Sequence, residues 1–356
     1  MKLFLRILTS ILLVICMIFV PKNLYGELNQ DKITDEMYRR REKYFYGVIT
    51  LWQIDSFEGG TGSRANWLKS VVAGFERRNN GVFINVETIS STLAQQLISS
   101  GQKRPDLISF GADCDFNSAD FEALKIETEN IHPSVKKITL ENAIPWCMGA
   151  YFMFGQGDEN QWGTDGKIIT AKKAKKSVFS VGLPIKQGYN SAKNLEHLSG
   201  NFSAELSLKT ASPQELFEGY NYSQNINRIV GTQRDFYRLE AAKSREKARA
   251  GDIKFLGYSD LFQYIGILKC ENEKKTATMQ DFIAFLLEPE QQNKLGTIGL
   301  FPVRVDALPQ YNNENMNYWW NEIKTINFKS DTMLFQTAKG QAEWEKSLQK
   351  LKTPIN

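Results

Sequence analysis

The chain has 356 residues, of which 42% are hydrophobic and 12% aromatic, and its formal net charge is +4. A chain of this length is expected to form about two domains, and its hydrophobic content is sufficient for their cores. The weak net charge and the absence of a long basic run argue against nucleic-acid binding. We therefore expect a folded protein whose partners do not include nucleic acid.

The first 26 residues have the form of an export signal. Lys2 and Arg6 precede an apolar run over residues 7–20, and a small residue suited to cleavage follows that run. An uncleaved signal-anchor is the alternative, because the run is only slightly short for a membrane span. In either case residues 1–26 are expected to direct export, and the highly charged residues 27–45 are expected to form a spacer.

The cysteines and histidines argue against a disulfide framework and against a metal site. Cys16 lies inside the apolar run, where the large Ile15 before it disfavours lipid attachment, and the cysteines that follow are few. His132 and His197 have no cluster of carboxylates or cysteines at ligand spacing nearby. We therefore expect no metal, no cofactor and no histidine-based catalytic triad.

The first part of the folded chain alternates strands and helices. Its hydrophobic patterns predict strands at 47–54, 82–87 and 105–110, with amphipathic helices at 64–79 and 92–100. This order favours a parallel sheet with crossover helices.

A glycine-rich loop joins the first expected strand to its helix. Gly59, Gly60 and Gly62 permit a tight turn and a close approach to a ligand, and Ser63 can cap a helix that starts near Arg64. A strand end that meets a helix start places free N–H groups and a positive dipole end in one cleft. The loop is not a phosphate loop, because no Gly-Lys-Ser/Thr follows it.

The middle of the chain is expected to pass between two domains. An aromatic, apolar run at 142–155 suits a crossing strand, and 255–268 suits a returning strand. A second strand-to-helix turn is expected near 229–233, where Gly231 would break the strand. The remaining expected elements are strands at 177–185 and 199–210 and helices at 212–220, 233–251, 316–325 and 341–351.

Several segments taken in order resemble a known family. A strand ending at Trp52 is followed by a loop, two helices and the sequence PDLISFG at 105–111. Residues 277–304, ATMQDFIAFLLEPEQQNKLGTIGLFPVR, are similar to that family's two-helix segment and its turn of the form G-x-x-P-x-R. Over roughly residues 45–305 the chain resembles the bacterial extracellular solute-binding proteins of ABC transporters, in particular the group that includes maltose- and other sugar-binding proteins.

The resemblance implies a type II periplasmic-binding-protein-like fold, with two α/β lobes and a ligand cleft between them. Lobe 1 would comprise 46–145 and 256–305, and lobe 2 would comprise 146–255 and 306–356. It implies an exported monomer, released or anchored by its N-terminus, that captures a small polar solute such as a sugar or sugar derivative and delivers it to an ABC permease. Two alternatives stay open: a membrane-associated sensory module of the same fold, and an enzyme acting on glycans.

Ligand contacts are expected from both lobes. Trp52 is either a core residue or a platform for a sugar ring. Asp55 and Glu58 either accept hydroxyl protons or are solvated loop residues, and nothing else in the sequence supports a pair of glycoside-cleaving carboxylates. The expected ligand-binding set is Trp52, Asp55, Glu58, Gly60, Thr61, Ser63, Arg64, Gly111, Tyr151, Thr232 and Arg234, and no catalytic residue is expected.

Two arginines bear on the charge of the ligand. Arg64 and Arg234 each follow a glycine turn at an expected helix start, one in each lobe. If both face the cleft, an anion such as a sugar phosphate or an acidic sugar is favoured. If either pairs with Glu58 or Asp235, the field is small and a neutral sugar is favoured. The sequence favours the neutral sugar, because each arginine has an acid close by.

Overall fold

A computed structural model describes most of the chain from residue 45 onward. The described residues are 45–57, 59–112, 114–155, 180–184, 207–223, 226, 228–245, 247, 252–332, 334–336, 338–339, 342–343 and 345–346. Contacts divide the chain into two units, 1–47 and 48–356. The first unit lies almost wholly outside the described residues, as do the expected export signal, most of the expected spacer, Glu58 and His197.

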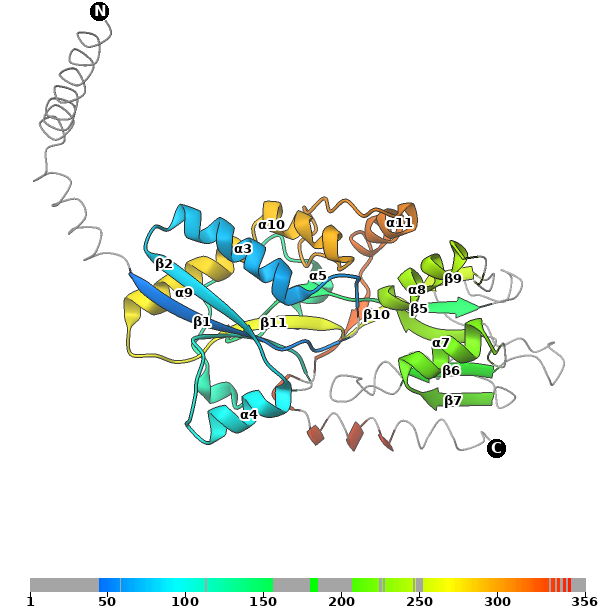
Figure 1. The fold of residues 1–356 in the computed structure, drawn as a ribbon, viewed down its shortest axis with the longest axis horizontal. Coiled ribbons are helices and arrows are strands. Elements are labelled where there is room, and N and C mark those ends of the chain that lie inside the picture. The colour runs from blue at the N-terminus through cyan, green and yellow to red at the C-terminus, as the bar shows by residue number, and fades with distance from the viewer. Residues whose placement is uncertain are drawn as a thin grey trace, which may run out of the picture. The chain divides into compact units, whose positions relative to one another are not determined.

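The first sheet has five strands in the order β2-β1-β3-β11-β4 (Figure 1). The strand β1 (Gly47–Gln53) runs parallel to β3 (Leu107–Phe110), as the alternation of strands and helices along the chain predicts. The strand β11 (Phe262–Ile267) is antiparallel to β3 and to β4 (Ile144–Met148), and β2 (Val82–Thr88) forms one edge. Every residue of β3, β4 and β11 is buried, because helices cover the faces of a sheet built by crossovers.

Helices cover the first sheet with apolar faces. Ser63 caps α3 (Arg64–Arg78) by accepting from the backbone N–H of Asn66, and Trp67 of that helix stacks on Trp146 with ring centroids 4.9 Å apart. The other helical elements of this part are α4 (Ser91–Ser99), η1 (Ser118–Asp120), α5 (Pro133–Lys136), α9 (Glu273–Leu286), α10 (Pro289–Asn293) and η3 (Lys294–Ile298). Among the described residues, no helix has both the length and the apolar character that crossing a membrane requires.

The second sheet has five strands in the order β7-β6-β8-β5-β9. The strand β6 is parallel to β7 and β8, whereas β5 is antiparallel to β8 and β9. The bounds are β5 (Tyr151–Gly155), β6 (Ser180–Pro184), β7 (Ser207–Ala211), β8 (Arg228–Thr232) and β9 (Asp252–Phe255). The helices α7 (Pro213–Asn221) and α8 (Gln233–Lys243) pack on this sheet (Figure 1).

Two details near β8 differ from the expectation. Gly231 does not break the strand, because β8 continues through it and pairs it with Phe152. A Cβ at Gly231 would lie 2.6 Å from an oxygen of Asp235, so the glycine is required by close packing of α8. The helix expected to reach residue 251 ends at Lys243. The next residue, Ser244, donates its hydroxyl to the Ala241 carbonyl, and this bond competes with the backbone hydrogen bonds that would continue the helix.

The chain crosses between the sheets at two adjacent places. Gly149 and Ala150 join β4 to β5, and the Gly149 N–H donates to the Leu261 carbonyl at 2.7 Å on the returning segment. The Ala150 N–H donates to Gln233 Oε1 at 3.0 Å, which ties the crossing to α8. The expected two-lobed architecture is therefore present, and the first sheet extends past the expected boundary at 145 to Met148.

The helix α11 (Glu314–Ile323) contacts both lobes through neighbouring tryptophans. Trp319 lies 4.5 Å from the ring of Phe152 and 4.7 Å from that of Phe236, both in the second lobe. Trp320 stacks on Phe301 in the first lobe. The short strands β10 (Tyr258–Ser259) and β12 (Lys329–Ser330) pair in parallel nearby, and much of the helix expected at 341–351 lies outside the described residues.

The fold should lose stability in mild acid through His132. The buried ring caps α5, with Nδ1 accepting from the Ser134 N–H and Nε2 donating to the Ile323 carbonyl. Burial lowers the pKa of His132 in the native state. Between that pKa and the unfolded value near 6.5 the unfolded chain binds the extra proton, so the free energy of unfolding falls as pH falls.

Urea unfolding from about pH 7.5 down to about pH 5 measures this loss. The matched control is His132→Asn, which keeps a capping acceptor but does not titrate. An equal loss in wild type and in this variant would contradict a role for His132.

Candidate functional site

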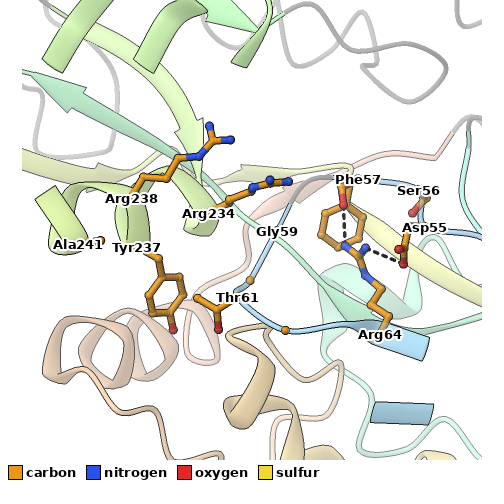
Figure 2. A pocket seen from close by; sticks show the side chains of 12 residues that line it. Asp55, Ser56, Phe57, Gly59, Thr61, Arg64, Arg234, Tyr237, Arg238 and Ala241 are labelled. Atoms are coloured by element: carbon orange, nitrogen blue, oxygen red, sulfur yellow. Dashed lines mark hydrogen bonds and ion pairs between the residues drawn. The ribbon is translucent and has the colours of Figure 1, made fainter. Parts of the chain in front are cut away.

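A cavity of about 660 Å³ is lined from both lobes. The first lobe supplies the segment between β1 and α3, and the second lobe supplies one face of α8 (Figure 2). Its volume lies in the range of small-molecule sites. The lining residues are Asp55, Ser56, Phe57, Gly59, Gly60, Thr61, Gly62, Arg64, Arg234, Tyr237, Arg238 and Ala241.

A buried polar network holds the start of the lining segment. Gln263 of β11 donates from Nε2 to the Ile54 carbonyl at 2.6 Å and to Ser109 Oγ at 3.0 Å. Its Oε1 accepts from the Ser56 hydroxyl at 2.9 Å, and Trp146 Nε1 donates to Ser109 Oγ at 2.9 Å. Gln263 and Ser109 are 0% exposed, so every polar atom here depends on these partners. Gln263 and Ser109 are each a polar residue within an otherwise apolar strand, and this pattern could have identified them in the sequence.

Arg64 organises the turn that follows. Its guanidinium donates to the Phe57 carbonyl at 2.7 Å, pairs with Asp55 at 3.2 Å and lies 4.2 Å from the centroid of the Phe57 ring. The Arg64 side chain is 6% exposed, whereas that of Asp55 is 55% exposed. Burial raises the pKa of the neighbouring Cys147 thiol to about 12, and the charge of Arg64 opposes that rise. The turn is therefore held around a buried cation.

The glycine loop forms one wall of the cavity by contact with η3. The N–H groups of Thr61 and Gly62 donate to the Ile298 carbonyl, at 2.9 and 3.4 Å. Gly60 has a φ of +71°, and a Cβ added there would lie 2.1 Å from the same oxygen. The expectation that this loop offers free N–H groups is wrong for Thr61 and Gly62, because both donors are used within the protein.

The helix α8 presents a single face to the cavity. Arg234, Tyr237, Arg238 and Ala241 follow the spacing i, i+3, i+4, i+7, which places them on one side of a helix. Burial raises the pKa of the Tyr237 phenol to about 12, so it is a neutral hydrogen-bonding group at physiological pH. Tyr237 and Arg238 were missed from the sequence, although the helical spacing from Arg234 would have found them.

Asp235 makes several contacts at the start of α8. Asp235 forms an ion pair with Arg238 at 3.2 Å and accepts from the Thr232 N–H at 2.9 Å. Thr232 caps the helix by accepting from the Arg234 N–H, and the two residues form a capping box with Asp235. Asp235 therefore balances Arg238, a cation that the sequence argument had not included.

Of the expected ligand-binding residues, Asp55, Gly60, Thr61, Arg64 and Arg234 line the cavity. Glu58 lies outside the described residues.

The other expected contact residues are buried in the core or cap helices. Trp52 is 0% exposed and donates from Nε1 to Glu87 at 3.0 Å, so the expectation of a sugar-stacking platform is wrong and its alternative, a core residue, is correct. Tyr151 is also 0% exposed, and its hydroxyl donates to Asp260. Ser63 and Thr232 cap helices, and Gly111 is buried. None of these five residues is among those that line the described cavity.

No group of three or more histidine, cysteine, aspartate or glutamate side chains in the described segments is arranged to hold a metal ion. The cavity has one carboxylate, that of Asp55, among its described lining residues. The arrangement suits the binding of a small polar molecule.

Two α/β lobes joined by adjacent crossing segments, with a polar cavity lined from both, define the fold of the substrate-binding proteins of ABC transporters. Solved structures share this fold at low sequence identity. The GacH receptor of Streptomyces glaucescens, solved unliganded and with acarbose, matches with a TM-score of 0.56 at 11% identity, covering 86% of this chain and 93% of its own. The sugar-binding protein MalE of Xanthomonas citri matches with a TM-score of 0.56 at 13% identity, covering 86% and 95%.

A third structure shows how widely the fold is used. The spermidine/putrescine substrate-binding protein PotD of Streptococcus pneumoniae matches with a TM-score of 0.51 at 15% identity, covering 86% of this chain and 98% of its own. No protein-family model and no curated protein matches the sequence. The resemblance noted in the sequence is thus confirmed for the fold, and the ligand has to be argued from the cavity.

Proposed function

We propose that this chain is an exported substrate-binding protein, which captures a small polar solute and delivers it to an ABC permease. The observation that carries the proposal is a cavity lined by a first-lobe turn and by one face of α8 in the second lobe. A solute that touches both walls binds the closed arrangement better than an open one, and so shifts the population toward closure. A permease can then distinguish loaded from empty protein by its shape.

The solute that we propose is a carbohydrate or a carbohydrate derivative. Asp55 offers an exposed carboxylate that can accept from hydroxyl groups, and Thr61 adds a hydroxyl. Phe57 and Tyr237 supply rings against which the apolar face of a sugar can pack, a role expected of Trp52. Two structural neighbours are a receptor solved with acarbose and a sugar-binding protein, whereas PotD is a spermidine/putrescine-binding protein, so the fold alone leaves the class of solute open.

Ligand binding should close the protein measurably. Purified protein is first screened by thermal unfolding against neutral sugars, acidic sugars, sugar phosphates, amino acids and polyamines, because a ligand of the native state raises the melting temperature. Each ligand found is then examined by small-angle X-ray scattering, and the radius of gyration is expected to fall at saturation. An unchanged scattering curve at saturating ligand would contradict the closing mechanism.

The two alternatives make different predictions. A membrane-associated sensory module would bind and close without a permease, so solute uptake by vesicles reconstituted with an ABC permease and this protein separates the proposal from that alternative. An enzyme would convert its ligand, and incubation followed by product analysis would reveal that. Asp55 is the described carboxylate in the cavity that such an enzyme would use. We expect Asp55→Asn to weaken binding, and we expect no turnover in either the wild-type protein or the variant.

A further inference from the structure

We propose that Tyr237 and Gly299 form an interlobe latch, which keeps part of the protein closed before any solute binds. The inference goes beyond the proposed function, because it concerns the protein without solute. Tyr237 belongs to α8 of the second lobe, and Gly299 caps the end of η3 in the first lobe. Tyr237 lines the cavity, whereas Gly299 is not among the lining residues.

The ring of Tyr237 occupies the space that a side chain at position 299 would need. A Cβ added to Gly299 would lie 2.7 Å from Cε2 of Tyr237, 2.9 Å from its hydroxyl oxygen and 3.0 Å from Cζ. Gly299 also has a φ of +67°, which glycine adopts without strain. Glycine at this position therefore lets a ring of the second lobe rest directly on the backbone of the first.

The first-lobe side of the contact is held by hydrogen bonds. The Gly299 N–H donates to the Gly296 carbonyl at 3.2 Å, and the carbonyl of the next residue, Leu300, accepts from the Tyr311 hydroxyl at 2.9 Å. Burial raises the pKa of Tyr311 well above its usual range, and the nearby Tyr237 phenol adds to that rise. The Tyr237 ring thus meets a fixed backbone and lies near a buried ring of the first lobe.

The second-lobe side of the contact lies beyond the crossing between the lobes. Gln233, the first residue of α8, accepts from the Ala150 N–H at the crossing. Tyr237 comes one turn later, about 6 Å along the helix axis, and Figure 2 shows it extending from α8 toward the loop that carries Thr61. The crossing joins the lobes in any arrangement, whereas Tyr237 reaches Gly299 only when α8 approaches η3. Opening should therefore break this contact and leave the crossing intact.

The contact favours closure without help from a solute. Burial raises the pKa of the Tyr237 phenol to about 12, as expected for a ring that is largely shielded from water. Opening would return apolar ring surface to water, which costs free energy. The latch therefore raises the closed population of the solute-free protein. When the latch is lost, the apparent affinity for a solute that binds the closed form should fall by the same factor as the closed fraction.

Small-angle X-ray scattering of the solute-free protein tests the latch. Gly299→Asn places a Cβ against the Tyr237 ring, and asparagine is one of the residues that tolerate a positive φ. Tyr237→Ala removes the ring and leaves the glycine unchanged. We expect both variants to have a larger radius of gyration than the wild-type protein, because each loses closed population. Circular dichroism checks that both remain folded.

Two further variants are matched controls. Gly101→Asn makes the same change at a φ of +68° with nothing within 4 Å of the added Cβ, and Tyr237→Phe keeps the ring on Gly299. Both should keep the wild-type radius of gyration. If Gly299→Asn does not fold, the comparison of Tyr237→Ala with Tyr237→Phe decides.

The latch is contradicted if a folded Gly299→Asn or Tyr237→Ala keeps the wild-type radius of gyration, or if either control expands as they do. None of these measurements uses a solute. Failure of the latch therefore leaves the proposed function intact, and that function is judged separately by the ligand screen.

Discussion

Replacing Gln263 by leucine should destabilise the protein by about 4 kcal/mol and weaken solute binding. The side chain is 0% exposed, and its amide satisfies the Ile54 carbonyl, the Ser56 hydroxyl and Ser109. Leucine has a similar size but leaves these buried groups without that partner, which costs about 1–3 kcal/mol for each group that stays unsatisfied. Ser56 lines the cavity and Ile54 immediately precedes Asp55, so the loss should also move the binding residues.

Urea unfolding gives the change in stability, and titration with the solute found in the screen gives the change in affinity. The matched control is Gln102→Leu, which makes the same substitution at an exposed turn and should change stability by less than about 0.5 kcal/mol. If Gln263→Leu unfolds at the same urea concentration as wild type, the buried network does not hold the cavity segment.

Replacing Gly60 by alanine should cost about 3 kcal/mol and abolish most of the affinity for solute. Two effects add at this position. Its φ of +71° is unfavourable for an L side chain, which costs about 1–2 kcal/mol. The new Cβ would also lie 2.1 Å from the Ile298 carbonyl oxygen, a backbone atom, so the loop must move. That movement breaks the bond from the Thr61 N–H and displaces one wall of the cavity.

Gly101 separates the two effects. Its φ is +68°, but nothing lies within 4 Å of an added Cβ, so Gly101→Ala should show the backbone cost alone, about 1–2 kcal/mol. The difference in unfolding free energy between the two variants gives the cost of the steric contact between a side chain at position 60 and η3. Equal destabilisation of both, with binding retained in Gly60→Ala, would show that this contact does not shape the cavity.

Local sequence patterns determined the elements and much of their order. The period of the apolar residues in 64–79 and the capping serine before it predicted α3. The pattern at 212–220 predicted α7, at whose start the structure shows a capping box. The aromatic run at 142–155 predicted a passage between lobes, and the structure places it in two strands of different sheets. These predictions succeeded because helix periodicity, caps and strand alternation are properties of neighbouring residues.

The lining of the cavity was decided by tertiary structure. Asp55, Gly60, Thr61, Arg64 and Arg234 line it, in keeping with a strand-to-helix turn as a local signal of a cleft, and their part in ligand binding stays a prediction. Trp52 was misassigned because alternation in a strand does not reveal that helices cover both faces of its sheet.

Distant contacts also fixed the chemistry of the cavity. Gln263 acts on residues more than 150 positions away in sequence, and Ile298 occupies the N–H groups that the glycine loop had been expected to offer. Asp235 and Arg238 are neighbours on one helix, yet only the folded arrangement shows that Arg238 faces the same cavity as Arg64. Sequence determined which elements form, because they depend on nearby residues. Tertiary structure decided which side chains and charges meet, because burial and pairing depend on residues that only folding brings together.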